Sequence, residues 1–257
     1  MYFDSHAHYD DRQFDPDRDE LLLSLSESGV DYVINCASDL ASAEKVLDLV
    51  RRYDFVYGAV GIHPEAVGGL DPEAVTSLYG YIEESSKIVA VGEIGLDYHY
   101  EDNPERDVQQ EWFIEQIELA KELELPVIVH SRDAAADTYE ILRDYDAEQV
   151  GGVLHSYSGA PEMAQKYIDM GFYLGIGGMI TFANAKKVAA TVEKMPLERL
   201  LIETDCPYLA PVPMRGKRND SGNLRYIAER IAQIKGVTPE EVARVTTENA
   251  KRLFQIQ

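Results

Sequence analysis

The chain has 257 residues, of which 45% are hydrophobic and 27% are charged, with 18 glycines and 11 prolines. This composition excludes a disordered or collagen-like protein and allows a sizeable buried core. The 24 basic and 46 acidic residues give a net charge of −22. The average surface therefore repels phosphates, which argues against passive coating of nucleic acids or anionic membranes unless bound cations reverse the field locally.

Cysteine content and the N-terminal segment bear on location. Cys36 and Cys206 are too few for a disulfide-dense secreted scaffold, and we expect both to be buried thiols. The first 20 residues lack the basic and apolar stretches of a signal peptide, and no run of about 18 apolar residues occurs. The sequence predicts a cytoplasmic protein with no membrane partner, and it leaves the oligomeric state open.

Short apolar runs recur along the chain and are separated by segments long enough for a helix. One such segment carries Phe113, Ile114, Ile117 and Ala120 on one helical face. Near the C-terminus, the run 238–241 (TPEE) predicts a capping box at the start of a helix. The eight predicted strands span residues 2–6, 31–36, 55–62, 88–93, 127–130, 151–155, 172–176 and 199–205.

Strands that are apolar throughout and alternate with helices indicate a parallel sheet covered on both faces. A (β/α)8 TIM barrel, typically about 250 residues long, would use the whole chain as a single domain over residues 1–257. The main alternative is an open doubly wound sheet. That fold usually carries a glycine-rich phosphate loop after the first strand, where this chain has the run 4–8 (DSHAH).

Side chains that can bind metals follow several predicted strands. In a barrel the carboxyl ends of the strands meet at one mouth, so residues distant in sequence can converge there. Four imidazoles and two carboxylates exceed the three protein ligands of a usual catalytic zinc site, so we expect two divalent cations. The predicted ligands are His6, His8, Glu93, His130, His155 and Asp205.

We expect Glu93 to bridge the two cations and to be catalytic, with His6, His8 and Asp205 on one cation and His130 and His155 on the other. Asp205 is the candidate general base, or alternatively a pure ligand or a helix cap. Zn, Mn, Ni, Fe and Mg all remain open as the native metal. Because no Ser, Cys or Thr lies in a recognisable nucleophile motif, we expect direct hydrolysis by metal-bound hydroxide and no organic cofactor.

Further residues near the predicted strand ends are candidates for substrate contact. His63 could donate to a phosphate or could be a loop histidine bonded to the backbone. Tyr98, His99 and Tyr100 could stack on a base or could simply pack. The basic candidates for phosphate contact, which could instead form surface ion pairs, are Arg132, Arg215, Lys217 and Arg218.

Seven segments lie in order along the whole chain: 3–10 (FDSHAHYD), 61–65 (GIHPE), 92–98 (GEIGLDY), 126–134 (PVIVHSRDA), 155–159 (HSYSG), 203–211 (ETDCPYLAP) and 215–219 (RGKRN). Together they resemble the TatD family of metal-dependent deoxyribonucleases and related hydrolases of the amidohydrolase superfamily. The resemblance implies a (β/α)8 barrel and a divalent-metal site at the same six ligands. After the last of these segments the family commonly continues with Glu-Pro, whereas this chain reads Asp220-Ser221-Gly222.

The leading functional hypothesis is a metal-dependent deoxyribonuclease with DNA as substrate, which trims ends as an exonuclease. The alternative keeps the metals but changes the bond to an ester or amide, as in an aminoacyl-tRNA deacylase, and the low pI of about 4.5 favours it. A non-catalytic interaction module is a third class, and a complete set of six metal ligands argues against it.

Overall fold

The computed structural model describes residues 1–71 and 73–257. These residues contain eight strands, which are β1 (Tyr2–Ala7), β2 (Val30–Cys36), β3 (Val56–Val60), β4 (Ile88–Asp97), β5 (Val127–Arg132), β6 (Gly152–Leu154), β7 (Tyr173–Ile176) and β8 (Leu200–Ile202). The strand pairs β1–β2, β3–β4, β4–β5, β5–β6 and β7–β8 are all parallel.

Each strand is followed by a helix, and two long helices close the chain. Short 3-10 helices lie in several of the connecting loops. The α-helices are α1 (Arg18–Ser24), α2 (Leu40–Arg52), α3 (Glu73–Glu83), α4 (Arg106–Glu122), α5 (Ala135–Asp144), α6 (Pro161–Asp169), α7 (Lys186–Lys194), α8 (Leu224–Lys235) and α9 (Pro239–Leu253).

The strand order in the sheet is the chain order, β1 to β8. Parallel strands in chain order, each followed by a helix, are the architecture of a (β/α)8 TIM barrel, which confirms the predicted fold class. The strands are apolar because they are buried: all ten residues of β4, for example, are buried. A strand that is buried on both faces of the sheet has apolar residues throughout, without alternation of apolar and polar residues.

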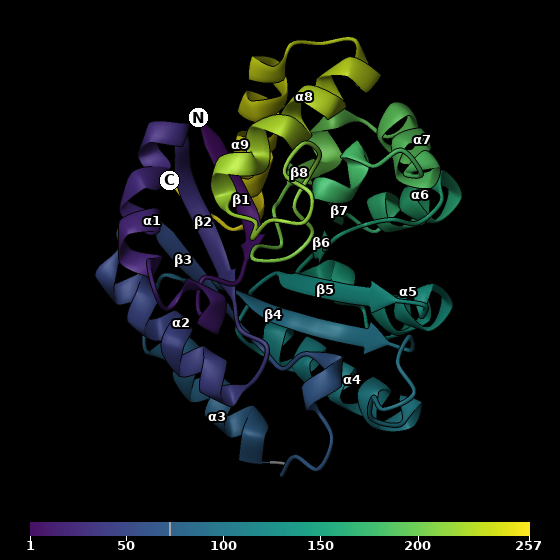
Figure 1. The fold of residues 1–257 in the computed structure, drawn as a ribbon. Coiled ribbons are helices and arrows are strands. Elements are labelled where there is room, and N and C mark those ends of the chain that lie inside the picture. Colours follow the sequence, from purple (N-terminus) through teal and green to yellow (C-terminus); the bar gives the residue numbers. More distant parts are fainter. Residues whose placement is uncertain (72) are drawn as a thin grey trace. The chain divides into compact units, whose positions relative to one another are not determined.

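Two compact units make up the chain, and we call them the terminal and the central unit. The terminal unit contains Met1–Asn35, Ser156–Asp169 and Tyr173–Gln257, and the central unit contains Cys36–His155 and Met170–Phe172. In the terminal unit β1 pairs with β2, β7 pairs with β8, and Ala7 bridges to Cys206. In the central unit β3 to β6 pair in sequence, and α2 to α5 lie outside these strands (Figure 1). The single domain predicted for residues 1–257 stays a prediction.

Strand ends differ from the prediction in ways that matter for the site. β4 extends to Asp97 because that residue pairs with Arg132 at the end of β5. β3, β6 and β8 are shorter than predicted, so His63, His155 and Asp205 lie in the loops just beyond their strands.

The start of α9 shows one of the two hydrogen bonds of the predicted capping box. The Thr238 side chain accepts a hydrogen bond from the Glu241 backbone at 3.2 Å, as the predicted capping box requires at the start of α9. The Glu241 carboxylate pairs with Arg244 on the next turn. Within residues 1–71 and 73–257, no helix combines the length and apolar character needed to cross a membrane.

Candidate metal-binding site

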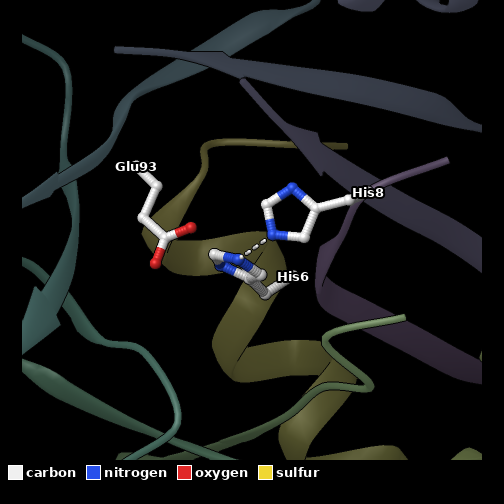
Figure 2. A group of neighbouring side chains, drawn as sticks. All are labelled: His6, His8 and Glu93. Carbon is white, nitrogen blue, oxygen red and sulfur yellow. Dashed lines mark hydrogen bonds between the residues drawn. The ribbon is translucent and has the colours of Figure 1, made fainter. Parts of the chain in front are cut away.

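In the terminal unit, three predicted ligands lie together, and we call them the terminal donor group: His6, His8 and Asp205. The Nε2 atoms of His6 and His8 are 3.0 Å apart, joined by the dashed line in Figure 2. Asp205 Oδ1 lies 3.5 Å from His8 Nε2 and 3.8 Å from His6 Nε2. His6 is fully buried, and the side chains of His8 and Asp205 are only 13% and 16% exposed.

The geometry of this group suits a cation. Two nitrogens bound to one zinc-sized ion at about 2.0–2.1 Å, with an angle of roughly 95–110° between them, are about 3.0–3.4 Å apart. The observed 3.0 Å between the two imidazoles falls in that range. The donor types are also those that divalent transition metals prefer, so the residues fit a metal ion.

The ends of β1 and β8 are tied together by hydrogen bonds that set the positions of the ligands. Asp205 N–H donates to the His6 carbonyl at 2.9 Å, and His8 N–H donates to the Cys206 carbonyl at 2.8 Å. Below them, the buried Asp4 carboxylate accepts from the backbone N–H of Thr204 at 2.9 Å and from its hydroxyl. Burial raises the pKa of Asp4 to about 7.

Ser221 completes this network at the point where the chain departs from the family pattern. Its hydroxyl donates to Asp4 Oδ2 at 2.6 Å, and its backbone N–H donates to the Tyr9 hydroxyl at 2.9 Å. Proline has neither group. The serine therefore adds a donor to a buried carboxylate that a proline at this position could not supply.

The central unit holds a second set, the central donor group, formed by Glu93, Asp97 and His130. His130 Nδ1 lies 2.9 Å from Glu93 Oε1, and His130 Nε2 lies 2.9 Å from Asp97 Oδ2. His155 Nε2 and His63 Nε2 are each 3.8 Å from Glu93 Oε1. The donor atoms of His63, Glu93 and His130 all lie within 4.8 Å of one another.

Hydrogen bonding makes His130 strongly basic. Burial by itself lowers the pKa of His130, but hydrogen bonds to Asp97 and Glu93 outweigh it and raise the pKa to about 9. Without metal, the ring is thus a cation held between two carboxylates. A metal ion that binds either ring nitrogen of His130 must displace the proton there, because only neutral imidazole ligates metals.

A backbone hydrogen bond determines which ring nitrogen of His63 carries the proton. It precedes the short helix Pro64–Ala66, and its Nδ1 accepts a hydrogen bond from the Glu65 backbone at 3.2 Å. The neutral ring therefore carries its proton on Nε2, the atom that lies toward Glu93. This tautomer makes His63 a hydrogen-bond donor rather than a metal ligand.

Two buried glutamines of α4 position the ends of β3 and β4. Gln116 accepts from the Ile62 backbone N–H at 2.7 Å and donates to its carbonyl at 3.2 Å. Gln109 makes the same pair of contacts with Asp97, at 2.8 and 2.9 Å. Because each amide satisfies both backbone groups of a buried residue, His63 and Asp97 are held at fixed positions.

Sequence analysis missed Asp97, although a signal for it exists. Asp97 is 1% exposed and holds the second nitrogen of His130. It lies four residues after Glu93 in the same strand, a spacing that alternation places on one face. A carboxylate that fixes the other nitrogen of a ligand histidine is a regular feature of metal sites.

The four predicted basic contacts fall into different environments. The Arg132 guanidinium lies 4.8 Å from the Tyr100 ring centroid, and that of Arg215 lies 4.3 Å from the Phe182 centroid. Arg218 instead forms two hydrogen bonds with the Asp17 carboxylate, at 2.7 and 2.6 Å. Its role as a phosphate contact, like that of Lys217, stays a prediction.

Both cysteines are fully buried, as expected. Burial, with a contribution from the nearby Asp4 carboxylate, raises the pKa of the Cys206 thiol, so the thiol is not an activated nucleophile.

Comparison with known proteins gives consistent results over the whole chain. A family model described as "TatD related DNase" matches residues 3–255. The uncharacterized metal-dependent hydrolase YabD of Bacillus subtilis is 44% identical over 259 residues, covering 100% of both chains. The putative deoxyribonuclease TATDN3 of Mus musculus is 35% identical over 264 residues, covering 98% of this chain and 87% of its own.

A solved structure agrees with the sequence relatives. The TatD homologue YjjV of Escherichia coli K12 superimposes with a TM-score of 0.94 at 31% identity, covering 100% of this chain and 98% of its own. The sequence match and the structural match extend over the same residues that carry both donor groups. The chain therefore belongs to the TatD family and is a metal-dependent hydrolase.

Proposed function

We propose that this protein is a deoxyribonuclease that removes nucleotides from DNA ends by hydrolysis of phosphodiester bonds. The observation that carries the proposal is the pair of buried imidazole and carboxylate donor groups at the carboxyl ends of the strands in a TatD chain. The description of the family model as a DNase and the name of the mouse relative support DNA as the substrate.

The terminal and central donor groups would hold two divalent cations. The carboxyl ends of all strands in a (β/α)8 barrel share one face, which is where such enzymes place their active sites. His6, His8 and Asp205 would hold one cation, and His130 and His155 the other. Glu93 stays the ligand predicted to serve both cations.

When bound, divalent cations lower the pKa of water and polarise the phosphoryl oxygen. The residues of the chain then complete the reaction. Asp205, whose side chain is 16% exposed, accepts the proton that the attacking water loses. Asp97 holds His130 in orientation, and His63 donates a hydrogen bond from Nε2 to a phosphate oxygen.

The phosphates of the substrate would be bound by exposed basic side chains. Arg132 and Arg215 present guanidinium groups that suit bidentate phosphate contact, and Lys217 adds a charge. Arg218 would first have to leave Asp17. These few basic residues matter because the chain as a whole, with a net charge of −22, repels DNA.

The test is hydrolysis of end-labelled single-stranded DNA by protein that has been stripped of metal and then reconstituted with Mg²⁺, Mn²⁺ or Zn²⁺. A ladder from one end that requires metal and disappears in Glu93→Ala and Asp205→Asn supports the proposal. Intact single- and double-stranded DNA with every metal, despite stoichiometric metal binding, overturns it.

A second candidate is hydrolysis of an ester or amide, such as an aminoacyl-tRNA ester, at the same centre. The strongly acidic composition favours it, because a dedicated DNA enzyme gains from a broadly basic surface. Activity on an ester and amide panel, with none on DNA, would select this alternative.

A further inference from the structure

An exposed aromatic residue and an arginine are brought together where β4 and β5 end. Asp97 lies opposite Arg132 in the register of the two strands, and Tyr98 N–H donates to the Arg132 carbonyl at 2.9 Å. Three residues after β4, the Tyr100 hydroxyl accepts a hydrogen bond from Arg132 Nη1 at 3.1 Å. The guanidinium lies over the Tyr100 ring, 4.8 Å from its centroid.

Tyr100 makes an edge-on contact with the His99 ring, with the centroids 4.7 Å apart, but it is more exposed than Tyr98. The Tyr98 hydroxyl donates to Asp137 at 2.8 Å and accepts from Gln110 at 2.9 Å, which fixes that ring in place. The His99 ring pairs with Asp133 at 2.8 Å. Tyr100, in contrast, is 51% exposed. A large aromatic surface left in water beside a candidate active site is a signal for ligand stacking.

Arg132 also differs from several other arginines of the chain. Arg51, Arg143, Arg218 and Arg244 each form a salt bridge with a carboxylate. Within the part of the chain that the structure describes, Arg132 forms none, and its guanidinium hydrogen bond goes to a neutral hydroxyl. The charge of Arg132 acts on the Asp97 and Glu65 carboxylates, but without a salt bridge its guanidinium can still contact an anion, and the Tyr100 ring holds the planar group in place.

The position of Arg132 relative to the central donor group fits a polynucleotide. Arg132 follows His130 by two residues in β5, so both side chains leave the strand on the same side. Two strand residues span about 6.6 Å, which is comparable with the separation of neighbouring phosphates along an extended strand. An anion on Arg132 would therefore be the next phosphate when one phosphate lies at the donor group.

We propose that Tyr100 and Arg132 form a nucleotide subsite for a single strand. The unpaired base next to the cleaved bond stacks on the exposed Tyr100–Arg132 pair, and its phosphate binds the guanidinium. This inference rests on the proposed nuclease function and adds to it a preference for unpaired bases, because a paired base has no free face to stack.

Binding and cleavage are measured separately. Fluorescence anisotropy, with metal-stripped full-length protein, compares a labelled oligothymidylate with a base-free oligonucleotide of equal length that carries the same phosphates. Tyr100→Ala should weaken binding of oligothymidylate about tenfold or more and leave base-free binding within about twofold. Tyr100→Phe, which keeps the ring, should restore most of the affinity, and Arg132→Lys should weaken binding of both oligonucleotides.

Tyr145→Ala is the matched control. This tyrosine lies in the same unit and is 37% exposed, but it follows the C-terminal end of α5. In cleavage, Tyr100→Ala should raise KM for oligothymidylate and change kcat little. Equal binding of oligothymidylate by Tyr100→Ala and wild type, or an equal loss with the base-free strand, overturns the subsite. Base-dependent binding without any cleavage keeps the subsite and rejects the nuclease function.

Discussion

The terminal and central donor groups contain similar side chains but balance their charges differently. In the central group, each ring nitrogen of His130 has a carboxylate at 2.9 Å, so the protonated imidazole is hydrogen-bonded to an acid on both sides. In the terminal group, two imidazole nitrogens face each other at 3.0 Å and Asp205 stays at 3.5 Å or beyond. The central group thus has to release a proton to bind metal, whereas the terminal group already has the spacing of two ligands on one ion.

The largest expected effect tests whether both groups serve one reaction. Metal removal, Asp205→Asn and Glu93→Ala should each lower kcat/KM for single-stranded DNA by roughly 10³-fold or more, because each removes part of the proposed centre. Steady-state kinetics and metal analysis check this, with the exposed Asp169→Asn as the control in the terminal unit. Loss of activity in Glu93→Ala alone would show that only the central group is catalytic.

A second prediction concerns the carboxylate that distinguishes the central group. Asp97→Asn removes the anion that orients His130, and it should reduce metal affinity or kcat about 10- to 100-fold. Isothermal titration of the stripped protein with Zn²⁺ measures the affinity. Asp48→Asn, on the exposed face of α2, should behave like wild type. Unchanged affinity in Asp97→Asn would mean that Asp97 has no influence on the metal.

A third prediction addresses how the terminal group is supported. Ser221→Ala deletes a donor to the buried Asp4 and should cost about 1–3 kcal/mol of unfolding free energy, which lowers Tm by a few degrees. Thermal and denaturant unfolding measure it. Ser26→Ala, at an exposed position of the same unit, should change Tm little. A Tm equal to that of wild type would show that Thr204 alone satisfies Asp4.

The smallest effect separates two arginines that the sequence placed in one cluster. Arg215→Ala should reduce the dependence of log affinity for single-stranded DNA on log salt by about 0.7, the value for one phosphate contact. Arg218→Ala should leave that slope unchanged and lower Tm slightly, because Arg218 already pairs with Asp17. A change of slope in Arg218→Ala would restore it as a phosphate contact.

Much of the fold could be predicted because apolar strands buried on both faces leave a pattern that needs no knowledge of contacts. The strand ends were harder to place. β4 continues to Asp97 because of its pairing with β5, which is a property of the partner strand and not of the local sequence.

The sequence by itself determined the fold class and the family and predicted six metal ligands, since these depend on residue types and their order. Only the tertiary structure showed that Asp97 holds His130, that the Glu65 backbone sets the tautomer of His63, and that Arg218 is paired whereas Arg132 is available. The physical reason is that hydrogen bonds and ion pairs between distant residues depend on geometry within an ångström. The residue pattern alone does not specify that geometry.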